Sequence, residues 1–297
     1  MVRRQLGFSL ENYDRLLGSF VGFLEQAGAA RITTELAIAW ATQPKGTHPQ
    51  WWRARLGMVR GFARYLNTID PDSDIPPRDL LTAKRPRLAP YLYSQAEIAA
   101  LMDAARALGP SPLRGRTYET LIGLMAASGL RIGEALGLDR GDVDLNDGAL
   151  HVRVGKLGKQ RELPLQESTT EALREYSRLR DRRWPKPDTQ AFFLSTRGSR
   201  VTSKAVNYVF PQLICDIGLE DSSEHRRPRP HDLRHTFAVR TLLDWYRAGV
   251  NVDAQLPLLS TYLGHAHPAD TYWYLQAAPE LLALAGERLN GLLGACS

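Results

Sequence analysis

Apolar side chains recur at helical spacing along the first third of the chain. In the first such run they stand three or four residues apart, and Gly28 follows as a typical end of a helix. A short helix through residues 36–40 comes next, which Thr33 or Thr34 can cap. A longer helix is predicted from about residue 51 to 66. The apolar positions of the first run are Tyr13, Leu16, Leu17, Phe20, Val21 and Leu24.

The composition changes between residues 70 and 90, where five prolines stand among alternating charges. Such a segment does not form a compact element, so the composition predicts a linker. The chain is therefore expected to form a helical domain over residues 1–85, a connection at 86–91 and a second domain over 92–297.

Two capping boxes and one hairpin organise the second domain. Ser94 and Glu97 have capping-box spacing, as do Ser168 and Glu171, and each pair predicts the start of a helix. The strand-like runs ALHVRV and RELPL flank GKLGKQ, whose glycines can supply a hairpin turn. The rest of the chain after residue 202 is again helical in pattern. The expected fold is mainly α with a small β-hairpin or sheet.

Composition is that of a soluble globular protein, with 43% hydrophobic and 24% charged residues. No run approaches the roughly 20 apolar residues of a membrane span, and the N-terminus lacks the pattern of a signal peptide. Cys215 and Cys296 are far apart and have no metal-ligand spacing around them. We therefore expect a cytoplasmic protein with no disulfide framework, no metal and no membrane partner.

The formal net charge of +6 is concentrated at the N-terminal end. Residues 1–90 hold 13 Lys and Arg against 8 Asp and Glu, whereas the remaining chain is nearly balanced. This surplus favours a polyanionic partner such as DNA, but a solvated basic face explains it equally well. The candidate contacts are Arg53, Arg60 and Arg64 on one face of the longer helix, and Lys84, Arg85 and Arg87 near the end of the proline-rich segment.

Four separate segments carry residue types that phosphoryl transfer needs. Guanidinium groups stay charged and bind the oxygens of a phosphodiester in pairs. A tyrosine hydroxyl can form a covalent intermediate once a histidine removes its proton, and a lysine can protonate the departing 5′ oxygen. Each residue alone has a commoner structural explanation, and the complete ordered set is what favours catalysis. The segments are SGLRIGEALGL with Arg131, the hairpin with Lys156, PHDLRHTFA with His231, Arg234 and His235, and LGHAHPADTYWYLQ with His265 and Tyr274.

These segments resemble the tyrosine recombinase, or phage-integrase, family, which includes the Xer recombinases, lambda integrase and Cre. The resemblance extends from roughly residue 94 to 280. It implies a set of catalytic residues held in place by Glu134 and His235. The implied catalytic set is Arg131 and Arg234 as the clamp, Lys156 as general acid, His231 as general base or acid, His265 as phosphate hydrogen-bond donor and Tyr274 as nucleophile.

The choice between two tyrosines follows from the same resemblance. Tyr274 stands nine residues after His265, which is the usual spacing in the family. Tyr272 stands only seven residues after it, and we expect it to pack or to contact DNA. His267 has no counterpart that would give it a role.

The resemblance also implies the activity and its setting. A helical core-binding (SAM-like) N-domain and a mixed α+β catalytic domain would form a C-shaped clamp around double-stranded DNA. A site-specific recombinase or integrase would cut and rejoin strands through a 3′-phosphotyrosine, with no metal, ATP or other cofactor. The expected assembly is a homo-tetramer on specific recombination sites, associated with the nucleoid. Related recombinases of the same mobile element are candidate partners.

Two other functions and one open question accompany this interpretation. A type IB topoisomerase-like enzyme shares the chemistry but would act as a monomer without two specific sites. A non-catalytic helical DNA-binding regulator explains the charge but not the ordered catalytic set. The apolar face of the last predicted helix, which opens at Pro279, fits packing on a neighbouring protomer and packing on its own domain equally well.

Overall fold

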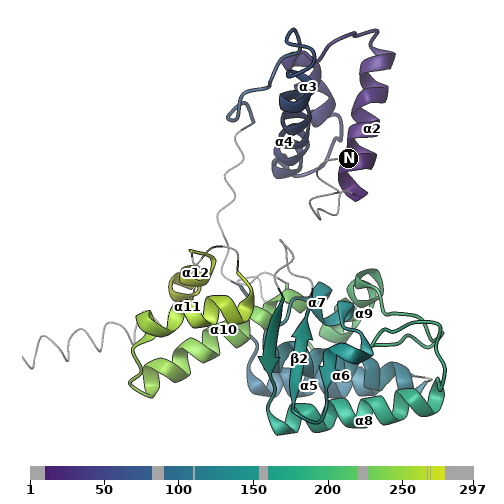
Figure 1. Cartoon of the computed structure of the whole chain (residues 1–297), viewed down its shortest axis with the longest axis vertical. Coiled ribbons are helices and arrows are strands. Elements are labelled where there is room, and N and C mark those ends of the chain that lie inside the picture. Colours follow the sequence, from purple (N-terminus) through teal and green to yellow (C-terminus); the bar gives the residue numbers. More distant parts are fainter. Residues whose placement is uncertain are drawn as a thin grey trace, which may run out of the picture. The chain divides into compact units, whose positions relative to one another are not determined.

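The elements of the chain are mainly helices with one small antiparallel sheet, in agreement with the predicted fold class (Figure 1). Contacts within the chain divide it into two compact units, residues 1–87 and 88–297, each of which is described by itself. No helix in the described part of the chain is long and apolar enough to cross a membrane. The computed structural model describes residues 11–81, 90–109, 111–153, 160–219, 227–265, 267 and 269–277.

In the described part of the first unit, residues 11–81, three helices pack around buried aromatic side chains. Thr33 caps α3 by accepting a hydrogen bond from the backbone N–H of Leu36 at 3.3 Å. Phe20 packs edge-on against Trp40 with ring centroids 5.2 Å apart, and the guanidinium of Arg55 lies 3.7 Å from the Trp40 ring centroid. All three predicted helices are present: α2 (Glu11–Gln26), α3 (Thr34–Thr42) and α4 (Pro49–Leu66).

The segment 70–81 belongs to this unit, so the prediction that a linker begins at residue 70 is wrong. The side-chain amide of Asn67 donates to the carbonyls of Pro71 at 3.1 Å and Ser73 at 2.9 Å. The backbone N–H of Asp74 donates to the carbonyl of Ile32 at 2.8 Å. These bonds fix a segment without helix or strand, which composition alone does not reveal. Lys84, Arg85 and Arg87 lie outside the described residues.

The second unit combines a helical bundle with a three-stranded antiparallel sheet of order β1-β2-β3. Its strands are β1 (Val143–Asp144), β2 (Ala149–Val152) and β3 (Arg161–Pro164), and Val152 pairs with Arg161 where β2 and β3 flank the predicted hairpin loop. Its helices are α5 (Gln95–Arg106), α6 (Pro112–Ser128), α7 (Ile132–Gly137), the 3-10 turn η1 (Arg140–Asp142), α8 (Glu167–Arg183), α9 (Ser203–Asp216), α10 (Pro230–Arg247), α11 (Val252–Leu263) and α12 (Ala269–Ala277).

One of the two predicted capping boxes is confirmed. The Ser94 hydroxyl accepts from the backbone N–H of Glu97 at 3.1 Å, and the Glu97 carboxylate accepts from the backbone N–H of Ser94 at 2.7 Å. The box at Ser168 is wrong because the N-cap of α8 is Gln166, two residues earlier, and its side chain makes no capping hydrogen bond. Glu171 instead pairs with Arg174 one turn along the same helix.

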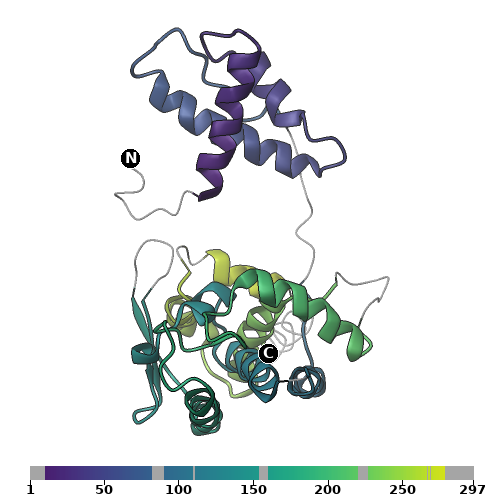
Figure 2. The same cartoon turned by 90° about the vertical axis from the view of Figure 1, so that its right-hand side faces the viewer.

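Helix α6 is the centre of the second unit and is buried along most of its length. It contacts α5, α8 and α10, and Figure 2 views the long helices α5, α6 and α8 nearly along their axes. A separate apolar cluster joins α10, α11 and α12 and includes Tyr274. The left-handed Gly129 (φ 62°) ends α6 and turns the chain towards Arg131.

Replacing Gly129 should destabilise the second unit. A Cβ atom there would lie 2.5 Å from Cδ1 of Phe237, in a left-handed conformation that costs an L-residue about 1–2 kcal/mol. We expect Gly129→Ala to lower the free energy of unfolding in urea by at least about that amount. Gly133→Ala is the matched control, because no atom beyond its chain neighbours and the backbone of its own helix lies within 4 Å of its Cβ position. Equal stability of the two variants would contradict this account.

Candidate active site

The carboxyl end of α11 forms the floor of the candidate site. Gly264 ends this helix in a left-handed conformation (φ 67°, ψ 44°). A Cβ atom at this position would lie 2.7 Å from Nη1 of Arg161, so the close approach of that guanidinium requires glycine. The carbonyls of Leu263 and Gly264 have no partner further along the helix and are met by two arginine side chains.

Arg234 links the ends of two helices from a buried position on α10. Its side chain donates to the carbonyl of Gly129 through Nη1 at 2.7 Å and to that of Leu263 through Nη2 at 2.7 Å. The residue is only 1% exposed. Burial, and then the charge of Arg131, lower the pKa of Arg234 to about 10, so it remains a cation at neutral pH.

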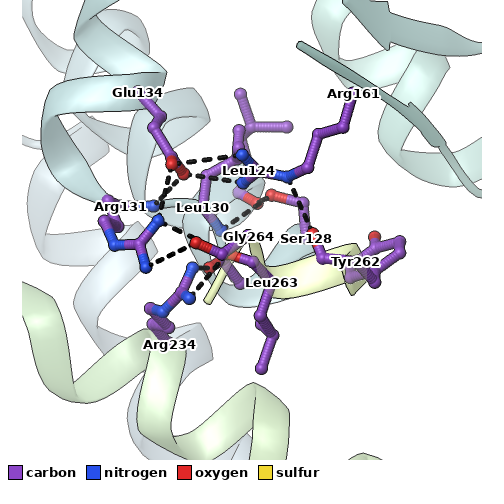
Figure 3. Close-up of polar contacts among 11 residues, drawn as sticks. Leu124, Ser128, Leu130, Arg131, Glu134, Arg161, Arg234, Tyr262, Leu263 and Gly264 are labelled. Carbon is purple, nitrogen blue, oxygen red and sulfur yellow. Dashed lines mark hydrogen bonds and ion pairs between the residues drawn. The ribbon is translucent and has the colours of Figure 1, made fainter. Parts of the chain in front are cut away.

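Arg131 stands at the N-cap of α7, and its guanidinium is fixed from two sides. Nη2 donates to the carbonyl of Gly264 at 3.0 Å, and Nη1 donates to Oε1 of Glu134 at 2.8 Å. The other oxygen of Glu134 accepts from the backbone N–H of Arg131 at 3.0 Å. The Gly264 carbonyl and the Glu134 carboxylate together therefore set the orientation of Arg131 (Figure 3).

Glu134 also binds Arg161, a residue to which the motifs assigned no role. Arg161, the first residue of β3, donates to Oε1 of Glu134 at 3.2 Å and to Oε2 at 2.8 Å. Burial alone would raise the pKa of Glu134, but hydrogen bonds from Arg161 and the backbone of Arg131 hold it below its usual range. Two guanidinium groups, those of Arg131 and Arg161, thus bind one carboxylate, and with the cation of Arg234 nearby the cluster is suited to an anion.

Two histidines of α10 contact each other, and one of them lies beside the predicted nucleophile. The rings of His231 and His235 meet edge-on with centroids 4.6 Å apart. Nδ1 of His235 lies 3.2 Å from the hydroxyl of Tyr274, within hydrogen-bonding distance. Tyr274 is 2% exposed, whereas Tyr272 is 46% exposed. Of the two tyrosines, Tyr274 is the one placed against the histidines.

His265 completes the group from the turn between α11 and α12. Its Nδ1 lies 2.7 Å from the hydroxyl of Thr271, and its ring stacks on that of Tyr274 with centroids 6.0 Å apart. Burial, and then the charges of Arg234 and Arg131, lower the pKa of His265 to about 4. His265 is therefore a neutral hydrogen-bonding group at neutral pH.

His231 is open to solvent on one side, while surrounding atoms exclude water from the other. This desolvation, followed by the charge of Arg234, lowers the pKa of His231 as well. A neutral imidazole in this position is able to accept a proton.

The structure brings together most of the residues singled out by the motifs. Lys156 lies outside the described residues, and His267 is exposed and keeps no assigned role. Within the described ranges, no group of three or more His, Cys, Asp or Glu side chains is placed to hold a metal ion. The residues that gather around the end of α11 are Arg131, Glu134, His231, Arg234, His235, His265 and Tyr274.

Comparison with known proteins identifies the family. The model of the phage integrase family matches residues 92–280. The chain belongs to the phage integrase family. A protein of Sinorhizobium fredii described as an integrase/recombinase, y4rB, is 43% identical over 294 residues, covering 97% of this chain and 94% of its own. The tyrosine recombinase XerD of Ralstonia nicotianae is 35% identical over 280 residues, covering 92% and 85%. The resemblance to tyrosine recombinases is confirmed.

A solved structure shares the fold of this phage integrase family member. The integrase of transposon Tn1549, in complex with transposon right-end DNA, matches with a TM-score of 0.67 at 20% identity, covering 97% of this chain and 96% of its own.

Acidification should destabilise the fold through His265. The unfolded imidazole has a pKa near 6.5, whereas the folded one stays neutral down to about 4, so unfolding takes up a proton between these values. The stabilisation is fully present above pH 6.5 and is lost as the pH falls towards 4. We expect urea unfolding of His265→Asn to depend less on pH in this window than that of wild type. His267→Asn, at an exposed histidine of the same turn, is the control, and an unchanged pH dependence in His265→Asn would refute the assignment.

Proposed function

We propose that this integrase cleaves and rejoins double-stranded DNA at specific sites, with Tyr274 as the nucleophile. The observation that carries the proposal is the position of the Tyr274 hydroxyl, 3.2 Å from His235 and beside the ring of His265. The same His265 lies in the field of Arg131 and Arg234. The nucleophile, proton acceptors and cations thus belong to one site.

The cations stabilise the reacting phosphate. As Tyr274 attacks, phosphorus becomes five-coordinate and negative charge grows on the non-bridging oxygens. Arg131 and Arg234, already oriented by backbone carbonyls, supply donors and charge without reorganising during the reaction. In this mechanism they provide the charge neutralisation, so the proposal includes no metal step.

Proton transfers accompany each bond change. The proton of Tyr274 passes to the histidine pair, in which His235 orients the hydroxyl and His231 is the general base. The bond from phosphorus to the 5′ oxygen breaks, and Lys156 protonates that oxygen. A 3′-phosphotyrosine and a free 5′ hydroxyl result. Rejoining reverses these steps with a 5′ hydroxyl as attacker, and the phosphotyrosine conserves the bond energy, so ATP is not needed.

The number of strands broken during strand exchange determines the number of protomers in the proposed assembly. Exchange between two duplexes breaks four strands, and each chain contributes one Tyr274, so four protomers on two sites form the working complex. Each protomer contacts its duplex with residues of both units. Related recombinases of the same element are proposed as further partners, and the nucleoid as the place of action.

Covalent trapping tests the nucleophile. On a nicked suicide substrate carrying the cognate site, we expect wild type and Tyr272→Phe to form a protease-resistant peptide on the 3′ phosphate. Tyr274→Phe should form none, because it lacks the attacking hydroxyl. Trapping by Tyr274→Phe would show that another residue attacks. Tight binding with no trapping by wild type would favour a non-catalytic regulator.

Arginines on α4 are proposed to follow the DNA backbone in the first unit. Arg53 and Arg64 are exposed, whereas Arg60 donates to the carbonyls of Pro76 at 2.7 Å and Pro77 at 2.6 Å. Burial, and then the nearby charge of Arg64, lower the pKa of Arg60. Arg60 therefore fixes the segment 70–81, and the two exposed arginines are the better candidates for phosphate contacts.

Salt titration of DNA binding separates these roles. We expect Arg53→Gln and Arg64→Gln each to reduce the slope of log affinity against log salt by about one per lost phosphate contact. Arg60→Gln should mainly reduce stability. Arg31→Gln is the control, since Arg31 pairs with exposed Asp72 at 3.2 Å. Unchanged affinity and slope in the first two variants would exclude them as DNA contacts.

A further inference from the structure

We infer that Arg161 is a positioning residue of the strand-transfer site, which orients Arg131 by sharing the carboxylate of Glu134 and anchors the strand that follows Lys156. This inference rests on the proposed function, because it assigns a role within that site. Arg161 itself is placed to act through other groups, since its side chain is 11% exposed and its guanidinium is bonded to Glu134 and to the carbonyl of Tyr262.

All three nitrogens of the Arg161 guanidinium donate hydrogen bonds. Nη1 and Nη2 bind the two oxygens of Glu134 at 3.2 Å and 2.8 Å. Nε donates to the carbonyl of Tyr262 in α11 at 2.8 Å. The guanidinium of Arg161 therefore links β3 to α7 and to the last turn of α11. A lysine carries a single ammonium group in place of the planar guanidinium, so it cannot make this set of bonds.

Glu134 is shared evenly between its two arginine neighbours. Oε1 accepts from the guanidinium of Arg131 at 2.8 Å and from Arg161, while Oε2 accepts from the backbone N–H of Arg131 at 3.0 Å and from Arg161. Without Arg161, half of these bonds and one of two cations are lost. The carboxylate would then draw the Arg131 guanidinium away from the carbonyl of Gly264, which orients it towards the site.

The position of Arg161 in the sheet adds a second link. Arg161 opens β3 and pairs with Val152 at the end of β2, so these two residues form the base of the loop that contains Lys156. The bond from Arg161 to Tyr262 fastens this base to α11, next to the carbonyls that hold Arg131 and Arg234. One side chain thus links the strand that follows Lys156 to the end of the helix that holds the arginine clamp.

Arg174 is a matched control in the same unit. It also binds a backbone carbonyl, that of Leu145, through Nε at 3.1 Å and Nη2 at 2.6 Å. It likewise pairs with two carboxylates, Glu167 at 2.8 Å and Glu171 at 2.9 Å. None of these partners belongs to the candidate site. Arg174→Gln therefore removes a chemically similar structural arginine without touching the catalytic group.

Single-turnover cleavage of the suicide substrate tests the inference with Arg161→Gln, Arg161→Lys and Arg174→Gln in the full-length chain. We expect Arg161→Gln to bind DNA like wild type and to cleave about 100-fold more slowly, because a misplaced catalytic group costs that much. Arg161→Lys keeps the charge and should recover only part of the rate. Arg174→Gln should cleave like wild type, and thermal unfolding of each variant separates a folding defect from a rate defect.

A substrate with a neutral methylphosphonate at the scissile position distinguishes positioning from general support of the fold. Removing the phosphate charge removes the need for the clamp, so the rate ratio of wild type to Arg161→Gln should shrink on this substrate, as it should for Arg131→Ala. An equal ratio on both substrates, wild-type cleavage by Arg161→Gln, or equal losses in the Arg161 and Arg174 variants would overturn the inference alone. Failure of wild type to form the Tyr274 adduct would overturn the proposed function and this inference with it.

Discussion

Backbone carbonyls at the carboxyl end of α11 fix both guanidinium groups of the candidate clamp. A helix leaves its last carbonyls without partners, and those of Leu263 and Gly264 accept from Arg234 and Arg131. The helix dipole places partial negative charge at this end, which favours cations. Because Arg131 follows α6 and Arg234 belongs to α10, the end of a single helix brings three distant parts of the sequence together.

Gathering the guanidinium groups of Arg131, Arg161 and Arg234 at the end of one helix is unfavourable unless other groups offset their repulsion. Glu134 and the helix-end carbonyls offset part of it, and Arg234 remains a cation although it is 1% exposed. In the proposed mechanism the remaining positive charge is balanced when the scissile phosphodiester binds, so the substrate stabilises the arrangement that the reaction needs. The guanidinium groups that repel one another in the free protein are therefore the same groups that would stabilise the transition state in this mechanism.

Local sequence patterns predicted the helices and one helix cap, whereas they did not predict the hydrogen bonds between residues far apart in the sequence. The capping box at Ser94 and the helical periods depend on neighbours within a few residues, and they were confirmed. The motif resemblance named the residues of the site. The bond from Arg161 to Glu134 spans 27 residues and that from His235 to Tyr274 spans 39, so no local pattern encodes either one. The prediction for the segment 70–81 was wrong for the same reason, since the backbone N–H of Asp74 bonds to the distant carbonyl of Ile32.

Helical geometry explains why the tyrosine nine residues after His265 is the one beside it. Thr271 and Tyr274 are three residues apart in α12 and so share one face of the helix. Thr271 bonds to His265 while Tyr274 stacks on the same ring, and the two contacts fix this face against the site. Tyr272 is rotated about 100° from Thr271 and is accordingly exposed. The spacing that distinguishes the two tyrosines is thus a consequence of the turn after Gly264 and the period of one short helix.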